Sequence, residues 1–212
     1  MKPKNIMFAL VLFVTGCAHY TLVQPARQPI GDLYTVMTEI PWSKSTEGHI
    51  ELWTVDGPLL EAIRFINGLE DGDSLLKTGT EKSKLPRFRG HMTPSDVLEF
   101  FVASIKSMGG GLEAEHLALG RVTSSAIRTA GINAGTAEAT NLRPAKFGSL
   151  SGFRFDFQFL SKEGLEREGM ALGTIHKEKL YLILYTGARQ YYYSKYQEEV
   201  ERLFSSIEIR SP

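Results

Sequence analysis

The chain has 212 residues with 24 basic and 24 acidic side chains, so its formal net charge at neutral pH is zero. This balance gives no electrostatic basis for binding nucleic acid, and no nucleic-acid partner is predicted. Its single cysteine, Cys17, lies near the amino end, which excludes disulfides and thiolate metal sites in the rest of the chain.

Residues 1–16 have the layout of a secretory signal peptide. Two lysines precede an uncharged, apolar run over residues 6–14, and two small residues follow, the second of which is Gly16. The run is too short for a transmembrane helix, which needs about 20 apolar residues, and the order of basic, apolar and small segments is typical of a cleaved leader. We therefore expect cleavage between Gly16 and Cys17.

The residues around Cys17 resemble the bacterial lipobox, in which one aliphatic and two small residues precede a cysteine. Here they read Val-Thr-Gly-Cys. In that class the thiol carries a diacylglycerol, and further acyl chains of the palmitate type make the anchor stable, since a single chain binds a membrane only marginally. Ala18 replaces the aspartate that retains lipoproteins in the inner membrane, so the expected location is the periplasmic face of the outer membrane. The alternative is an ordinary signal peptide with an incidental cysteine.

The mature chain is predicted to consist of a tether and one domain. Residues 17–31 contain the lipidated cysteine and then a stretch with two prolines and no periodicity, so they are expected to form a flexible tether. Residues 32–212 are expected to form a single globular domain, because about 180 residues suffice for a substantial apolar core.

The first half of this domain is predicted to contain strands and one helix. Strands are predicted over residues 33–40 and 49–55, which alternate in polarity. A turn at Asp56-Gly57-Pro58 is expected to end the second strand. Residues 59–67 fit either a helix or a strand, and a strand is favoured. Thr93 can cap a helix whose first residue is a proline, and an apolar stripe at helical spacing continues it over about 94–108.

The second half is predicted to form a β-meander, a helix and a last short strand. Residues 153–159 alternate strictly between phenylalanine and polar residues, which is typical of a half-buried antiparallel strand. Turns connect it to strands at 165–175 and 180–186. A helix is predicted over about 192–205, with Glu199 and its neighbouring glutamates in water, and a strand over 206–210. A mostly antiparallel sheet packed by two main helices is an α+β fold.

This half, from "GFRFDFQF" to "FSSIEI", resembles the end of the PsbP-like α/β/α sandwich superfamily. Those proteins finish with a meander, a helix rich in aromatic residues and glutamate, and a strand preceded by serines, here Ser205 and Ser206. As a pattern the resemblance covers about residues 33–210. It implies a PsbP-like sandwich and a non-catalytic accessory or partner-binding role, because some members assist larger complexes or bind a partner protein. It carries over no functional residue, and no enzymatic activity or cofactor is predicted.

Two segments are candidate binding surfaces. Tyr191, Tyr192 and Tyr193 open the last predicted helix; they either pack it onto the sheet or form the aromatic lip of a binding surface. Residues 123–140 are long and rich in small side chains, as functional loops often are. The alternative function is therefore an envelope hydrolase or small-ligand-binding protein with a pocket near these two segments.

Other candidate sites give weaker signals. Arg87, Arg89 and His91 follow one another at alternate positions and predict either a small anion-binding patch or a solvated loop. The "EAEH" stretch ending at His116 places its carboxylates and its imidazole on opposite faces of a strand, so no metal site is predicted. In "GSLSG", Leu150 occupies the nucleophile position of a hydrolase elbow, and no catalytic residue is assigned.

Overall fold

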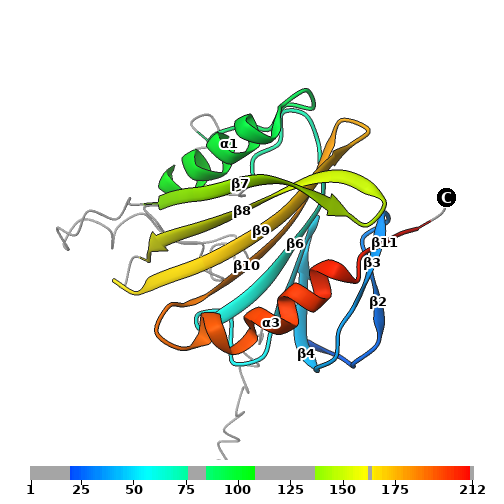
Figure 1. Ribbon diagram of the computed structural model, residues 1–212, viewed down its shortest axis with the longest axis vertical. Coiled ribbons are helices and arrows are strands. Elements are labelled where there is room, and N and C mark those ends of the chain that lie inside the picture. The colour runs from blue at the N-terminus through cyan, green and yellow to red at the C-terminus, as the bar shows by residue number, and fades with distance from the viewer. Residues whose placement is uncertain (1–19, 76–84, 108–136, 162–163, 211–212) are drawn as a thin grey trace, which may run out of the picture.

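The computed structural model describes residues 20–75, 85–107, 137–161 and 164–210. Within them the chain forms a large antiparallel sheet, a small one and two helices (Figure 1). The large sheet contains, from edge to edge, β1 (Thr21–Val23), β4 (Trp42–Glu47), β5 (Ile50–Thr54), β6 (Glu61–Leu69), β10 (Lys179–Ala188), β9 (Glu166–His176), β8 (Leu150–Leu160) and β7 (Ala137–Phe147). The small sheet contains β11 (Glu208–Ile209), β3 (Tyr34–Met37) and β2 (Arg27–Ile30), and the helices are α1 (Pro94–Ser107) and α3 (Tyr192–Ser205).

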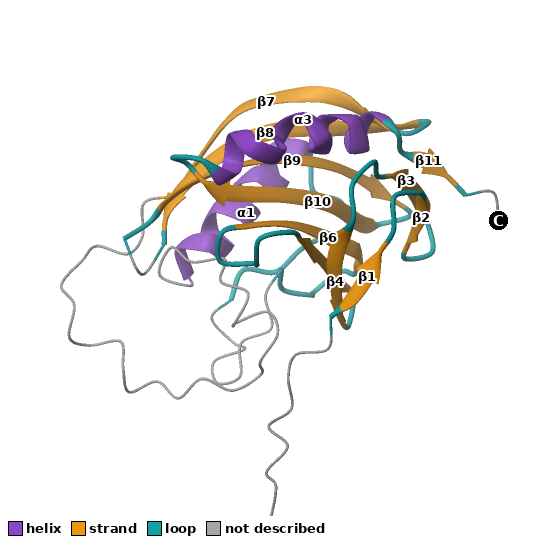
Figure 2. Ribbon diagram, turned by 90° about the horizontal axis from the view of Figure 1, so that it is seen from below, coloured by secondary structure: helices purple, strands orange, loops and turns teal. Residues whose placement is uncertain are grey.

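The large sheet is the middle layer of a sandwich. Helix α1 covers one face, while α3 and the small sheet cover the other (Figure 2). Each face therefore has its own apolar core, and the α+β class predicted from the sequence is confirmed. No helix among the described residues is long and apolar enough to span a membrane.

The core under α1 is built from the phenylalanines of β8. All four are buried, and the ring of Phe101 on α1 lies 5.2 Å from Phe155 and 4.8 Å from Phe157. Gly169 on the paired strand β9 makes room for them, since a Cβ there would overlap the ring of Phe157. The alternation predicted for residues 153–159 is thus confirmed.

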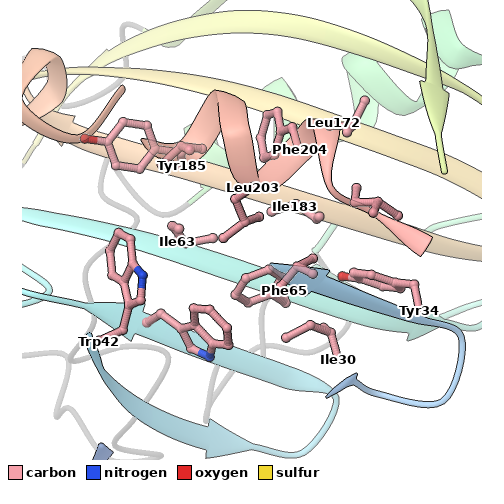
Figure 3. Packing of buried hydrophobic residues seen from close by; sticks show 14 of the residues in the cluster. Ile30, Tyr34, Trp42, Ile63, Phe65, Leu172, Ile183, Tyr185, Leu203 and Phe204 are labelled. Atoms are coloured by element: carbon pink, nitrogen blue, oxygen red, sulfur yellow. The ribbon is translucent and has the colours of Figure 1, made fainter. Parts of the chain in front are cut away.

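The core under α3 contains larger aromatic side chains from β3 to β6 and from β10 (Figure 3). Trp42 lies 6.3 Å from Trp53 and 5.9 Å from Tyr196 of α3, measured between ring centroids. Leu203 and Phe204 of α3 are buried in the same cluster. The helix has the bounds predicted from the sequence.

The three strands β8, β9 and β10 form the predicted meander, with both turns where the sequence places them. The favoured strand at 59–67 is confirmed as β6. Helix α1 is confirmed as well. At its start, the backbone N–H and the hydroxyl of Thr93 both donate to Asp96, each over 2.8 Å. This capping depends on residues close together in the chain, so the start of the helix could be predicted from the sequence.

The prediction of a tether over residues 17–31 is wrong for its second part. Residues 21–23 and 27–30 form β1 and β2, and Val23 and Ile30 are buried. Val23 pairs with Trp42 at the edge of the large sheet, so an apolar contact holds the segment without any alternation in its sequence. The described fold therefore begins near Tyr20. Residues 1–16 and Cys17 lie outside the described residues.

Two further strands were not predicted. Trp42, expected to follow the end of a strand, begins β4. Residues 137–140, expected in a long loop, begin the edge strand β7, whose side chains are mostly exposed and polar. Such strands owe their pairing to a neighbour rather than to a buried face. Residues 123–136 and the "EAEH" stretch lie outside the part of the chain that the structure describes.

Candidate functional site

Three connections meet at one end of the sandwich. They are the turn between β5 and β6, the start of β9, and the junction from β10 to α3. The backbone N–H of Ala188 donates to the carbonyl of Leu60 over 2.9 Å, and that of Arg189 donates to the carbonyl of Glu166 over 3.0 Å. Segments more than 100 residues apart in the chain are thus fixed side by side.

This end carries an apolar and aromatic surface, which we call the tyrosine end. It consists of Val55, Leu59, Leu165, Tyr191 and Tyr192. Leu59 is 59% exposed and Tyr191 57%. Four of the seven large apolar side chains exposed in the described residues belong to it. Single exposed apolar residues are ordinary, whereas a gathered group is typical of an interaction site.

The three predicted tyrosines have different surroundings. Tyr191 is exposed and meets Tyr192 edge to face, with centroids 5.1 Å apart. Tyr193 is half-buried and stacks on Tyr185 at 5.5 Å, and burial raises the pKa of Tyr193 to about 12. Tyr193 therefore packs α3 onto the sheet, Tyr192 is half-buried, and Tyr191 faces outward.

Lys195 ties the β5–β6 turn to α3. Its Nζ donates to Oδ2 of Asp56 over 2.6 Å, and the hydroxyl of Tyr196 donates to the same oxygen over 2.7 Å. Nζ also lies 4.8 Å from the ring centroid of Tyr196 and 5.6 Å from that of Tyr191. The hydrogen bond from Lys195, and next that from Tyr196, lower the pKa of Asp56, so this carboxylate stays charged at neutral pH.

A buried carboxylate shapes the turn from below. Oε1 of Glu61, which is fully buried, accepts hydrogen bonds from the backbone N–H groups of Val55 and Asp56 and from the Thr54 hydroxyl. Burial raises the pKa of Glu61, although these hydrogen bonds oppose it. From the other side, the guanidinium of Arg167 donates to the carbonyl of Leu59. The turn that exposes Val55 and Leu59 is therefore held at several points.

The candidate anion patch lies at the opposite end of β6, against a neighbouring turn. Arg89 forms an ion pair with Asp71 at 3.2 Å, and Nη1 of Arg87 donates to the carbonyl of Gly72 over 2.6 Å. His91 is exposed. The structure thus keeps these three residues away from the tyrosine end and gives both arginines an oxygen partner within the protein.

Three surface hollows have volumes of about 420, 280 and 300 Å³. The first and third flank α3, whereas the second lies beside the tyrosine end, where Glu166, Arg167 and Arg189 line it. None of the three is lined by Tyr191, Tyr192 or Tyr193. Across the residues that the structure describes, no three histidine, cysteine or carboxylate side chains gather as they would around a metal ion. The pocket predicted near Tyr191, Tyr192 and Tyr193 is therefore not one of these three hollows.

Several residues of this site gave no signal in the sequence. Nothing in the sequence distinguishes Lys195 or Arg167 from ordinary surface charges, and Glu61 is a single polar residue in the ambiguous segment 59–67. Glu199, expected in water, is buried and accepts hydrogen bonds from the Glu39 N–H over 2.8 Å and the Thr38 hydroxyl over 3.2 Å. Only Asp56 had a visible cue, because it opens an Asp-Gly-Pro turn.

Comparison with known proteins supports the fold. The solution structure of cyanobacterial PsbP (CyanoP) from Synechocystis sp. PCC 6803 matches with a TM-score of 0.52 at 13% identity, covering 95% of this chain and 99% of that one. The crystal structure of LpqN, involved in cell envelope biogenesis of Mycobacterium tuberculosis, gives a TM-score of 0.35 at 11% identity over 93% and 88% of the two chains, too low to carry an argument. No family model and no curated protein matches. The chain has a PsbP-like fold.

Proposed function

We propose that this protein is a lipid-anchored component of a bacterial cell envelope, whose PsbP-like body is a non-catalytic module that binds a partner protein through the tyrosine end. The observation that carries this proposal is that one end of the sandwich exposes Val55 and Leu59, on the turn whose N–H groups donate to Glu61, together with Tyr191 at the start of α3. The leader and the lipobox at Cys17 give the anchor, and Ala18 favours the periplasmic face of the outer membrane.

The surface has the composition of a protein-binding site. Tyrosine is enriched among the residues that dominate binding energy, because its ring buries a large area and its hydroxyl can find a partner. Around the apolar centre lie paired charges, since Arg189 contacts Glu166 at 3.1 Å and Glu168 at 3.0 Å. An apolar centre with a polar rim is the usual anatomy of an interface.

The surface is also pre-organised. The Glu61 carboxylate accepts hydrogen bonds from the N–H groups of the β5–β6 turn, and Arg167 and Lys195 donate hydrogen bonds to the same turn. A surface that is already ordered loses less conformational entropy on binding, so more of the contact energy appears as affinity.

Photo-crosslinking in the native bacterium tests this function. A photoreactive phenylalanine analogue would replace Leu59, Tyr191 or, as a control at the far end of the sheet, His91; all three positions are exposed. We expect a discrete adduct from the positions of Leu59 and Tyr191 and none from that of His91. The same adducts from all three positions, or none from any, would contradict a partner site at this end.

A further inference from the structure

We infer that the β1 edge of the large sheet rests on the lipid surface, so that the domain lies edge-on to the membrane. This orientation rests on the proposed lipid anchor at Cys17 and goes beyond it, because an anchor joined to the domain by a long linker would set no orientation. The inference combines the length of the linker between Cys17 and Tyr20 with the side chains that the structure exposes beside it.

This linker is short. The described fold starts at Tyr20, and Thr21 is already paired with Lys44. Only three residue steps separate Cys17 from Tyr20, and at 3.8 Å for each step they span at most about 11 Å. The headgroup region of one leaflet is itself roughly 5–8 Å thick. An acylated Cys17 therefore holds β1 at the boundary between headgroups and water.

The side chains next to this linker are of the kind found at the boundary between headgroups and water. Leu22 is 65% exposed, which is the largest exposure among the large apolar residues described, and Tyr20 is 39% exposed. Alternation along the strand places both on the face opposite Val23, which is buried. A tyrosine with an adjacent aliphatic residue is typical of proteins that contact the membrane interface.

The charges nearby do not oppose such contact. Residues 20–30 contain no carboxylate and one cation, Arg27, which pairs with Glu208 at 2.8 Å. Anionic lipid headgroups would therefore meet no repulsion from this segment. The opposite edge differs, because β7 exposes Glu138, Arg143 and Lys146.

The two edges point in different directions. Figure 2 shows β7 at the top of the sandwich and β1 at the lower right, and they are the first and last strands of the sheet order. With β1 on the lipid, β7 faces away from the membrane. Strands β8, β9 and β10, which cross the view of Figure 2, then run roughly along the membrane plane, so the tyrosine end faces sideways, toward a neighbour at the same membrane.

Quenching by lipid nitroxides tests the orientation on the full, lipidated protein. Because Cys17 is the single cysteine of the chain, an acylated protein has no free thiol, and one introduced cysteine can be labelled alone. Leu22→Cys and, as a control on the exposed β7 edge, Thr140→Cys would each carry an environment-sensitive dye. The protein is placed in vesicles of phosphatidylethanolamine and phosphatidylglycerol with a nitroxide near the headgroup.

We expect the dye at position 22 to lose most of its emission and to shift to the blue, while the dye at position 140 keeps both its intensity and its wavelength. If the protein floats with the vesicles but both dyes are quenched alike, or neither is, the orientation is overturned and the anchor stands. If the dye at position 22 is shielded only in native membranes, a protein covers β1 instead of lipid, which also overturns it. If unaltered protein takes up the label, Cys17 is bare, and the anchor and the orientation both fail.

Discussion

The two faces of the large sheet are held by different chemistry. Helix α1 packs on phenylalanine rings such as Phe155. Helix α3 combines apolar packing with hydrogen bonds: the Tyr185 hydroxyl donates to the Tyr192 carbonyl over 2.8 Å, and Arg154 pairs with Glu201. Apolar contact is non-directional, whereas hydrogen bonds fix a position. The contrast explains how α3 holds the tyrosine end in place.

The largest effect is expected on the α1 face. Phe155→Ala removes a fully buried ring between α1 and the sheet, and it should lower the free energy of unfolding by about 3–5 kcal/mol because a cavity remains. Urea denaturation measures this loss. Phe155→Leu, which fills part of the space, should lose clearly less; an equal loss for both variants would mean that ring packing is not what holds this face.

On the α3 face a smaller effect is expected from a polar group. Glu199→Ala leaves the Glu39 N–H without its acceptor, while the Thr38 hydroxyl keeps the Ile40 carbonyl at 2.9 Å; the unpaired N–H should cost about 1–3 kcal/mol of unfolding free energy. Glu199→Gln keeps an acceptor oxygen and is the matched control. If the glutamine variant is as unstable as the alanine variant, the acceptor is not the stabilising feature.

Much of the framework was predictable from the sequence because local signals were strong. The alternation in β8 and the apolar stripe of α3 each repeat at the period of their element, and α1 has its Thr93 cap. The edge strands β1, β2 and β7, and β4 next to β1, were missed because backbone pairing with neighbours, rather than a local pattern, makes them strands.

The candidate site was predictable only in part. The sequence drew attention to Tyr191 and Tyr192, yet it did not show that Asp56 pairs with Lys195 of the same helix across more than 130 residues of chain. Which surface residues gather there depends on how β6 and β10 pair. The burial of Glu199 likewise follows from the packing of α3 on the turn after β3, and no pattern within the helix reports that contact.

The buried carboxylate under the tyrosine end predicts a pH effect. Burial raises the pKa of Glu61 from 4.5, so the folded protein holds this proton more tightly than the unfolded chain. Its contribution to stability is therefore present below pH 4.5 and is lost as the pH rises through the folded-state pKa. Glu61→Gln lacks this titration.

Urea unfolding of both proteins across this range measures the effect. The stability of the natural protein minus that of Glu61→Gln should fall as the pH rises. A difference that stays constant, or that grows with pH, would show that Glu61 does not carry the burial cost assigned to it.

The smallest effect is expected from the ion pair at the surface. Asp56→Asn weakens the contacts with Lys195 and Tyr196, and the loss of stability should be of the size usual for exposed pairs. Because salt screens such pairs, the difference in unfolding free energy between Asp56→Asn and the natural protein, measured by urea unfolding, should become smaller at high ionic strength. A difference that does not change with ionic strength would indicate that Asp56 acts through packing instead.

Co-purification from detergent-solubilised envelope tests the proposed partner site most directly. The comparison is between the natural protein, a Leu59→Ser and Tyr191→Ala double variant, and a His91→Ala control, all shown by urea unfolding to be equally stable. We predict a partner protein that is recovered with the natural protein and the control and is lost with the double variant. Recovery of the same partner with all three, or of none with the natural protein, would contradict binding through the tyrosine end.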